Sequence, residues 1–133
     1  MMGSHCILSV EETIFPMAEI FTISRGSRTE TRVVTVSLEQ DGLVGRGESV
    51  PYGRYDETVE GVIADIRSMS DTMASGMTRQ ALQDLLPAGA ARNVMDCALW
   101  DLESKQSGKR VFELAGLAPP VAVQTAFTLS LAT

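Results

Sequence analysis

The first half of the chain alternates apolar and polar positions in a way that predicts β-strands. Residues 6–15 alternate roughly, and residues 30–39 are rich in Val and Thr, so both stretches are expected to be strands. Residues 43–49 predict a third strand, and the Asp-Gly pair before it predicts a hairpin turn. Gly45 and Gly47 in this third strand suggest that another backbone approaches it closely. The pattern therefore predicts an antiparallel three-stranded meander.

The second half changes to the three- and four-residue spacing of helices. Apolar positions recur in this way through residues 59–66, with Asp56 as a candidate N-cap. Residues 77–87 predict a short helix that a threonine caps, and residues 91–107 predict a long helix that ends at Gly108. The apolar stripe of the long helix consists of Ala91, Val94, Met95, Ala98, Leu99 and Leu102.

The order of these elements predicts an α+β fold, a three-stranded antiparallel meander followed by a helical bundle. The last 16 residues have a different pattern from residues 1–117. Pro119 and Pro120 predict a linker, and residues 122–132 predict a strand continuous enough to be buried in a parallel sheet. Because the pattern offers this strand no partner, we expect one domain over residues 1–117. Residues 118–133 would then be a linker and the first strand of a further domain beyond the chain.

Two loops hold the candidate binding residues. Residues 16–29 and 50–57 are long connections, and long loops in compact domains are often functional. Apolar side chains beside guanidinium groups suit a small ligand that has an apolar part and a carboxylate. The candidates are Phe21, Ile23, Arg25 and Arg28 in the first loop and Tyr52 and Tyr55 in the second. Composition alone favors solvated loop residues whose aromatic rings pack on the helices.

Composition narrows the function classes. The formal net charge of −6 over 133 residues argues against a nucleic-acid surface, which needs clustered Lys and Arg. No apolar run approaches the roughly 20 residues that span a membrane, and no signal-peptide pattern is visible, so a cytoplasmic location is expected. One histidine cannot build a zinc site. Asp96 and Asp101 point about 140° apart on a helix, so they form no catalytic pair. No catalytic or metal-ligating residue is expected in this chain.

Four longer stretches carry a family resemblance. The stretch ALWDLESKQSGKRVFELAGL at residues 98–117 resembles the helix and turn that close the N-terminal capping domain of the enolase superfamily, in its mandelate racemase/muconate lactonizing branch. Arg110 stands where that family usually has proline. The stretches at residues 23–30, 45–60 and 86–102 are most similar to the subgroup of dipeptide epimerases that act on L-Ala-D/L-Glu.

This resemblance implies a cap that covers a modified (β/α) barrel. In the family a proton is removed next to a carboxylate, lysines act as acid and base, and carboxylates of the barrel bind Mg²⁺. Those groups would all lie beyond residue 133. The resemblance thus implies an isomerase as the full-length protein, with Mg²⁺ held by the barrel and a dipeptide or N-acylamino acid as substrate. The 133-residue chain alone would be inactive.

The resemblance also suggests roles for single residues. The two loops would cover the mouth of the barrel, and one arginine would pair with the glutamyl carboxylate of the substrate. Arg28 is our first choice for that role and Arg25 the second. Thr128 falls at the end of the first barrel strand, where the subgroup contacts its substrate.

Alternatives remain open at this point. Within the superfamily, the protein could be an N-acylamino acid racemase or a muconate cycloisomerase-like enzyme. In a different class, a free cap could serve only as a binding or assembly module, with residues 122–132 as an exposed apolar edge that promotes self-association. The expected partners are the protein's own barrel and, as in many family members, further copies of itself.

Overall fold

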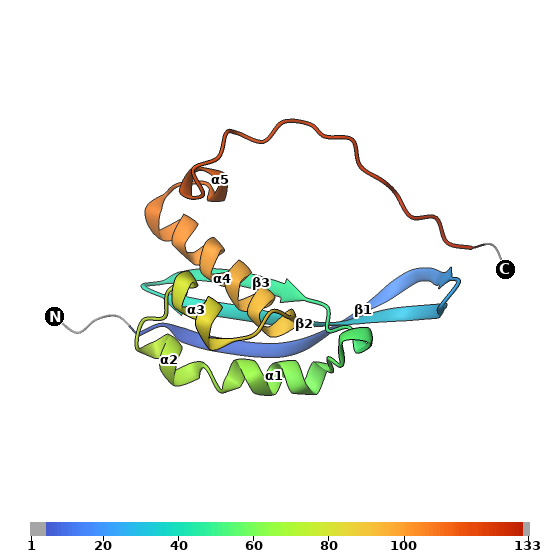
Figure 1. Cartoon of the computed structure of the whole chain (residues 1–133), viewed down its shortest axis with the longest axis horizontal. Helices are drawn as coiled ribbons and strands as arrows, with labels where there is room; N and C mark the ends of the chain where they lie inside the picture. The colour runs from blue at the N-terminus through green and yellow to red at the C-terminus, as the bar shows by residue number, and fades with distance from the viewer. Residues whose placement is uncertain (1–4, 132–133) are drawn as a thin grey trace.

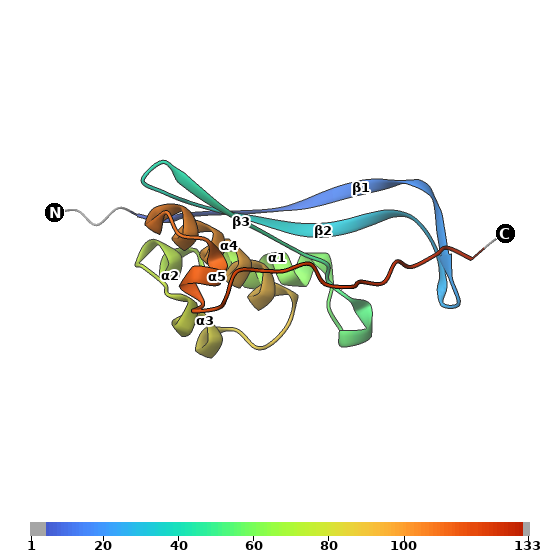
Figure 2. The ribbon, with the colours of Figure 1, turned by 90° about the horizontal axis from the view of Figure 1, so that it is seen from above.

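The computed structural model describes residues 5–131, and its center is a three-stranded sheet with helices on one face (Figures 1 and 2). The strands β1 (Ile7–Ile23), β2 (Gly26–Gln40) and β3 (Leu43–Ser49) pair in that order, and both pairings are antiparallel. Asp41 (φ 54°) and Gly42 (φ 76°) form the turn between β2 and β3 in the left-handed region that such two-residue hairpin turns require. The predicted meander and its Asp-Gly turn are confirmed.

The prediction of a loop over residues 16–29 is wrong. β1 continues to Ile23, β2 begins at Gly26, and the two strands form a long hairpin. The register shifts on the way: Pro16 lies opposite Glu30 but Phe21 opposite Arg28, so four residues of β1 face a single residue of β2. Such irregularities bend a strand, and the far end of the hairpin turns away from the plane of the sheet (Figure 2). Pro16 and the hydroxyl side chains of this stretch weaken its local strand pattern. Pairing between β1 and β2 stabilizes the strand conformation there.

The helices follow in the expected order. Thr58 caps the first α-helix by accepting a hydrogen bond from the Gly61 amide (3.0 Å). The N-cap predicted at Asp56 is wrong, because that residue takes a left-handed conformation (φ 58°) at the end of a 3-10 turn. Gly108 (φ 68°) ends the long helix, as predicted. The helical elements are η1 (Gly53–Tyr55), α1 (Val59–Arg67), α2 (Ser70–Ala74), α3 (Arg79–Leu85), α4 (Ala90–Ser107) and α5 (Val111–Leu114).

The core lies between the sheet and α4, and two glycines permit their close approach. A Cβ atom on Gly47 would lie 2.1 Å from the carbonyl oxygen of Val94, and one on Gly45 would lie 2.3 Å from that of Ala98. The close backbone approach predicted from these glycines is therefore confirmed. The apolar stripe of α4 is buried in this interface. Its partners from the sheet and the other helices include Val34, Val36, Leu38, Ile66, Met73 and Leu82.

Asp101, in the ALWDL motif, fastens α4 to the edge strand β3. Its carboxylate accepts hydrogen bonds from the Arg46 amide (2.8 Å) and from Lys105 Nζ (2.7 Å), and Lys105 also donates to the Val44 carbonyl (2.6 Å). Burial opposes ionization of Asp101, but the hydrogen bonds from Lys105 and the Arg46 amide outweigh it and lower the pKa of this carboxyl. The motif residue therefore has a structural role.

The strand predicted at residues 122–132 does not form within the described residues. Residues 118–131 are neither helix nor strand and are exposed throughout. They leave α5 in a long arc and end beside the far end of the hairpin, where Leu131 donates to the Thr22 carbonyl (2.9 Å) and Thr22 donates to Ser130 Oγ (3.0 Å). A strand needs a ladder partner, and these contacts do not supply one. The domain boundary after residue 117 remains a prediction.

Candidate functional site

A cleft of about 640 Å³ lies between β2 and the loop that precedes α1. Its walls include Arg28 and Arg32 of β2, Tyr52 and Arg54 near η1, and Glu57 ahead of α1. Two of the residues predicted from the sequence, Arg28 and Tyr52, thus line one cleft although they are 24 positions apart. The long hairpin positions Arg28, and the 3-10 turn positions Tyr52.

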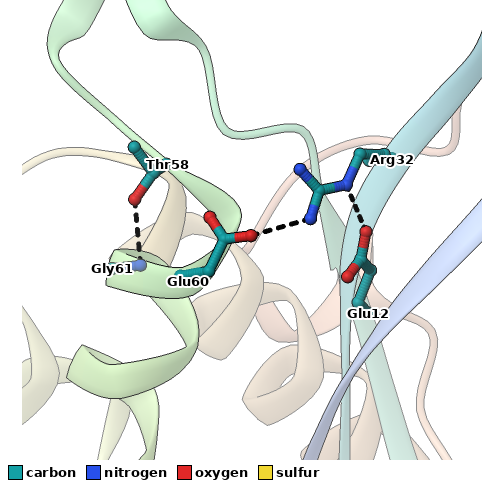
Figure 3. A network of polar contacts seen from close by, with 5 residues as sticks. All are labelled: Glu12, Arg32, Thr58, Glu60 and Gly61. Carbon is teal, nitrogen blue, oxygen red and sulfur yellow. Dashed lines mark hydrogen bonds and ion pairs between the residues drawn. The ribbon is translucent and has the colours of Figure 1, made fainter.

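Arg32, four positions after Arg28 on β2, is neutralized by two glutamates. Figure 3 shows its guanidinium between Glu12 of β1 and Glu60 of α1, and the distance from Arg32 Nη2 to Glu60 Oε1 is 2.8 Å. Hydrogen bonding to Arg32 lowers the pKa of both carboxyl groups and raises the pKa of the guanidinium. Arg32 therefore serves to hold α1 against the sheet.

Arg28 differs from Arg32 in having no carboxylate partner. It is exposed, and within residues 5–131 it forms no ion pair. Its ladder partner on β1 is the half-buried Phe21. A guanidinium next to an aromatic ring can take a carboxylate in a bidentate manner while the ring contacts the apolar part of the same ligand. This arrangement has the chemistry that the sequence predicted for the first loop.

Tyr52 and Tyr55 form a small aromatic pair at the other side of the cleft. Their ring centroids are 5.8 Å apart and the rings are tilted by 58°. Tyr52 is half-buried, whereas Tyr55 is 72% exposed and does not line the cleft. The pair therefore presents one ring to the cleft and the other to solvent, and the exposed ring is available to a ligand or to another part of the protein.

The remaining predicted residues lie elsewhere. Ile23 faces Gly26 at the tip of the hairpin, and Arg25 is in the turn itself; both are exposed. Thr128 is exposed on the extended C-terminal segment, two residues before the contact between Ser130 and the hairpin. The structure does not bring these three residues to the cleft, and their roles as substrate contacts stay predictions.

Sequence reasoning missed Glu57. Its carboxylate accepts hydrogen bonds from the amide of Tyr52 (3.0 Å) and from the amide of Ala90 (2.6 Å), so it joins the tyrosine loop to the start of α4. The sequence shows a glutamate shortly before a helix, which by itself indicates only a favorable charge near a helix N-terminus. The contact with Ala90, 33 positions away, required the tertiary structure.

Two further observations concern cofactors and membranes. Within residues 5–131, no three or more His, Cys, Asp or Glu side chains gather into a group that could hold a metal ion. The described residues therefore do not fit a magnesium site. In the same part of the chain, no helix has both the length and the apolar character needed to cross a bilayer.

A comparison with known families identifies the domain. Residues 7–116 match the N-terminal domain of the mandelate racemase/muconate lactonizing enzyme family, which is well over half of the chain. The chain belongs to this family. The resemblance noted in the sequence is confirmed, and the observed sheet and helices are those of the capping domain of the enolase superfamily.

The family members that resemble this cap are mostly epimerases and racemases. The chain is 45% identical to the L-Ala-D/L-Glu epimerase of Escherichia coli K12 over 95% of its own length and 39% of that enzyme. It is 39% identical to the N-acetyl-D-glutamate racemase of a Pseudoalteromonas species over 62% of its own length and 27% of that enzyme. The chain thus spans about two fifths of the first of these relatives, and it matches the portion that contains the cap.

A solved structure agrees with this assignment. An enolase family member from Agrobacterium tumefaciens with homology to dipeptide epimerases superimposes with a TM-score of 0.89 at 50% identity, over 96% of this chain and 39% of that one. That crystal structure contains sodium and L-Ala-L-Glu with an ordered loop. A dipeptide epimerase from Methylococcus capsulatus, 26% identical with a TM-score of 0.67 over 84% of this chain and 35% of that one, was crystallized with Mg and L-Arg-D-Lys.

Proposed function

We propose that this chain is the substrate-capping portion of a dipeptide epimerase that interconverts L-Ala-L-Glu and L-Ala-D-Glu. The observation that supports it best is the 50% identity, over nearly the whole chain, to a protein whose crystal structure holds L-Ala-L-Glu. The 45% identity to an L-Ala-D/L-Glu epimerase points the same way. The reaction would exchange the proton on the α-carbon of the glutamyl residue.

In this proposal the cap binds and orients, and another part of the protein does the chemistry. The groups that remove and return the proton, lysines by family resemblance, would lie in a barrel domain outside these 133 residues. The Mg²⁺ expected from the family would also bind there, because the described residues offer no group of ligands for it. The cytoplasmic location and assembly into a homo-oligomer, both expected from the sequence, remain part of the proposal.

Arg28 would select the glutamyl substrate. It faces the cleft, it has no carboxylate partner within the described residues, and Phe21 lies beside it in the ladder. Binding of the side-chain carboxylate of the substrate by this guanidinium would favor glutamate over its uncharged isostere glutamine. Tyr52 would contact the substrate from the opposite side of the cleft, and Tyr55, Ile23 and Thr128 would approach it from outside the cleft. Arg25 is the alternative partner for the same carboxylate.

The experiment measures α-proton exchange in D₂O with the full-length protein and Mg²⁺, using L-Ala-L-Glu and L-Ala-L-Gln. We expect Arg28→Ala to lower kcat/KM for L-Ala-L-Glu by roughly 10- to 100-fold, the value of a hydrogen bond to a charged group, and to leave L-Ala-L-Gln nearly unchanged. Arg25→Ala is the matched control from the same hairpin. If Arg25→Ala shows the selective loss instead, the role belongs to Arg25; if neither does, the cap does not recognize this carboxylate.

A second candidate is racemization of N-acylated glutamate. The similarity to the N-acetyl-D-glutamate racemase favors it, and that substrate also contains a glutamyl carboxylate for Arg28. Both substrates should therefore be assayed side by side with the full-length protein. A higher kcat/KM for N-acetyl-D-glutamate than for the dipeptide would replace the first proposal with the second.

A further inference from the structure

Glu57 joins two segments that are distant in the sequence. Its side chain is half-buried, and each of its carboxylate oxygens accepts one backbone hydrogen bond. Oε2 accepts from the amide of Tyr52 at 3.0 Å, and Oε1 accepts from the amide of Ala90 at 2.6 Å. Hydrogen bonds to an ionized carboxylate are stronger than those between neutral groups, so this one side chain can hold both segments in place.

The start of α4 lacks a cap of its own. Its N-cap residue is Gly89, which has no side chain to accept from the first-turn amides. Those amides have no partner within the helix, and a negative charge is favored next to them. A Cβ atom at Gly89 would lie 2.8 Å from Glu57 Oε1, so glycine at this position leaves the room that the carboxylate occupies. Glu57 thus supplies the cap from another element.

The other end of this bridge is the tyrosine loop. The carbonyl oxygen of Tyr52 accepts from the amide of Tyr55 (2.9 Å), which closes the 3-10 turn, and the two rings contact each other. Holding the Tyr52 amide therefore restrains the backbone of the turn that carries both rings. Tyr52 and Glu57 line the same cleft as Arg28. The two hydrogen bonds of Glu57 therefore hold the Tyr52 side of the cleft in place relative to the Arg28 side.

We propose that Glu57 is a positioning residue, which holds the Tyr52–Tyr55 loop against the first turn of α4 and thereby keeps the substrate cleft in its binding shape. The inference rests on the proposed function for its effect on a substrate. According to the inference, α4, through Glu57, determines the position of the Tyr52–Tyr55 loop, and the loop alone does not. Glu57 does not touch the reacting atoms, so it acts on substrate binding through the loop.

The experiment compares the wild-type full-length protein with Glu57→Ala and Glu57→Gln. Two quantities are measured: hydrogen–deuterium exchange of peptides covering residues 50–57, and kcat and KM for L-Ala-L-Glu. We expect Glu57→Ala to accelerate exchange in residues 50–57 and to raise KM about tenfold with little change in kcat, because the loss affects binding before the chemical step. Glu57→Gln keeps the length and one acceptor oxygen, so its effects should be intermediate, and it serves if Glu57→Ala does not fold.

Glu113→Ala is the matched control. The Glu113 carboxylate accepts from the amide of Arg110 (2.7 Å) at the start of α5, which is also a backbone contact near a helix N-terminus. It lies outside the cleft. Its loss should lower the melting temperature without changing exchange in residues 50–57 or KM. A purely structural role for Glu57 would give this same result.

Three outcomes separate the possible failures. A Glu57→Ala protein, or a Glu57→Gln protein in its place, with wild-type KM would overturn the inference and leave the proposed function standing. Unchanged exchange in residues 50–57 would also overturn it, since the loop would then not depend on the carboxylate. A folded, Mg²⁺-loaded wild-type protein that exchanges the α-proton of neither L-Ala-L-Glu nor N-acetyl-D-glutamate would overturn the proposed function, and this inference with it.

Discussion

The close approach of β3 to α4 predicts that Gly47 cannot be replaced, even by alanine. A Cβ atom at this position would lie 2.1 Å from the Val94 carbonyl oxygen and 3.0 Å from the Ala98 amide nitrogen. Cβ atoms in proteins essentially never come within 3.0 Å of such atoms, so α4 would have to withdraw by about 0.9 Å, the difference between 3.0 and 2.1 Å. Both obstructing atoms belong to the backbone and cannot rotate away as a side chain would.

The energetic cost follows from that withdrawal. A gap of 0.5–1 Å removes roughly a quarter to a half of the dispersion energy of the contacts across it. The stripe of α4 that would lose these contacts is buried, and Val94 and Ala98 are fully buried. Overpacking of a core costs about 1–3 kcal/mol, and we expect Gly47→Ala to reach about 3 kcal/mol because two backbone segments must separate. For a domain of this size that lowers Tm by about 10 °C.

The assay is urea and thermal unfolding of the wild-type protein, Gly47→Ala and Gly53→Ala. Gly53 is the matched control, because its Cβ atom would meet no atom within 4 Å and its backbone is not in the left-handed region. We expect Gly53→Ala to change the unfolding free energy by less than about 0.5 kcal/mol. A Gly47→Ala protein within about 0.5 kcal/mol of wild type would refute the reasoning, since it would mean that the two backbones can separate at little cost.

Two further predictions concern α1. Thr58→Ala should lower the free energy of unfolding, measured in urea, by about 1 kcal/mol, because the Gly61 amide loses its hydrogen-bond acceptor. Thr58→Ser keeps the hydroxyl and should keep most of that free energy. Equal losses in the two variants would contradict the capping role. Arg32 lowers the pKa values of Glu12 and Glu60 from the ordinary glutamate value of 4.5. The two ion pairs therefore stabilize the folded state above pH 4.5, and this stabilization is lost as the pH falls through the lowered pKa values. In an NMR titration, Arg32→Gln should therefore move both pKa values upward, and unmoved values would argue against the pairing.

Local patterns predicted much of this fold correctly. The Asp-Gly turn, the two glycines of β3 and the apolar stripe of α4 depend on neighbors within a few residues, so the sequence contains enough information to place them. The residues between Pro16 and Thr29 were misassigned for the opposite reason. Their strand state comes from pairing across the hairpin, with a shift of register that no local pattern announces. The same holds for residues 122–132, whose apolar pattern predicts a strand but whose ladder partner is not present among the described residues.

The candidate site divides in the same way. The residue types that would suit a carboxylate ligand, arginines close in sequence to Phe21 and Ile23, were visible in the sequence, and so was the family resemblance that the comparisons confirm. The sequence could not separate Arg28 from Arg25 by geometry. Only the hairpin register places Arg28 at the cleft and Arg25 in the turn.

The sequence by itself therefore determined the family, the order of the three strands and of the longer helices, the C-terminal end of α4 and the residue types at the cleft, because each depends on short-range spacing or on motifs. Only the tertiary structure decided which of these groups meet. Glu57 reaches the amides of both Tyr52 and Ala90 because α4 packs on the sheet at a distance that the glycines of β3 allow. Such contacts join residues tens of positions apart, and their geometry follows from the packing of whole elements.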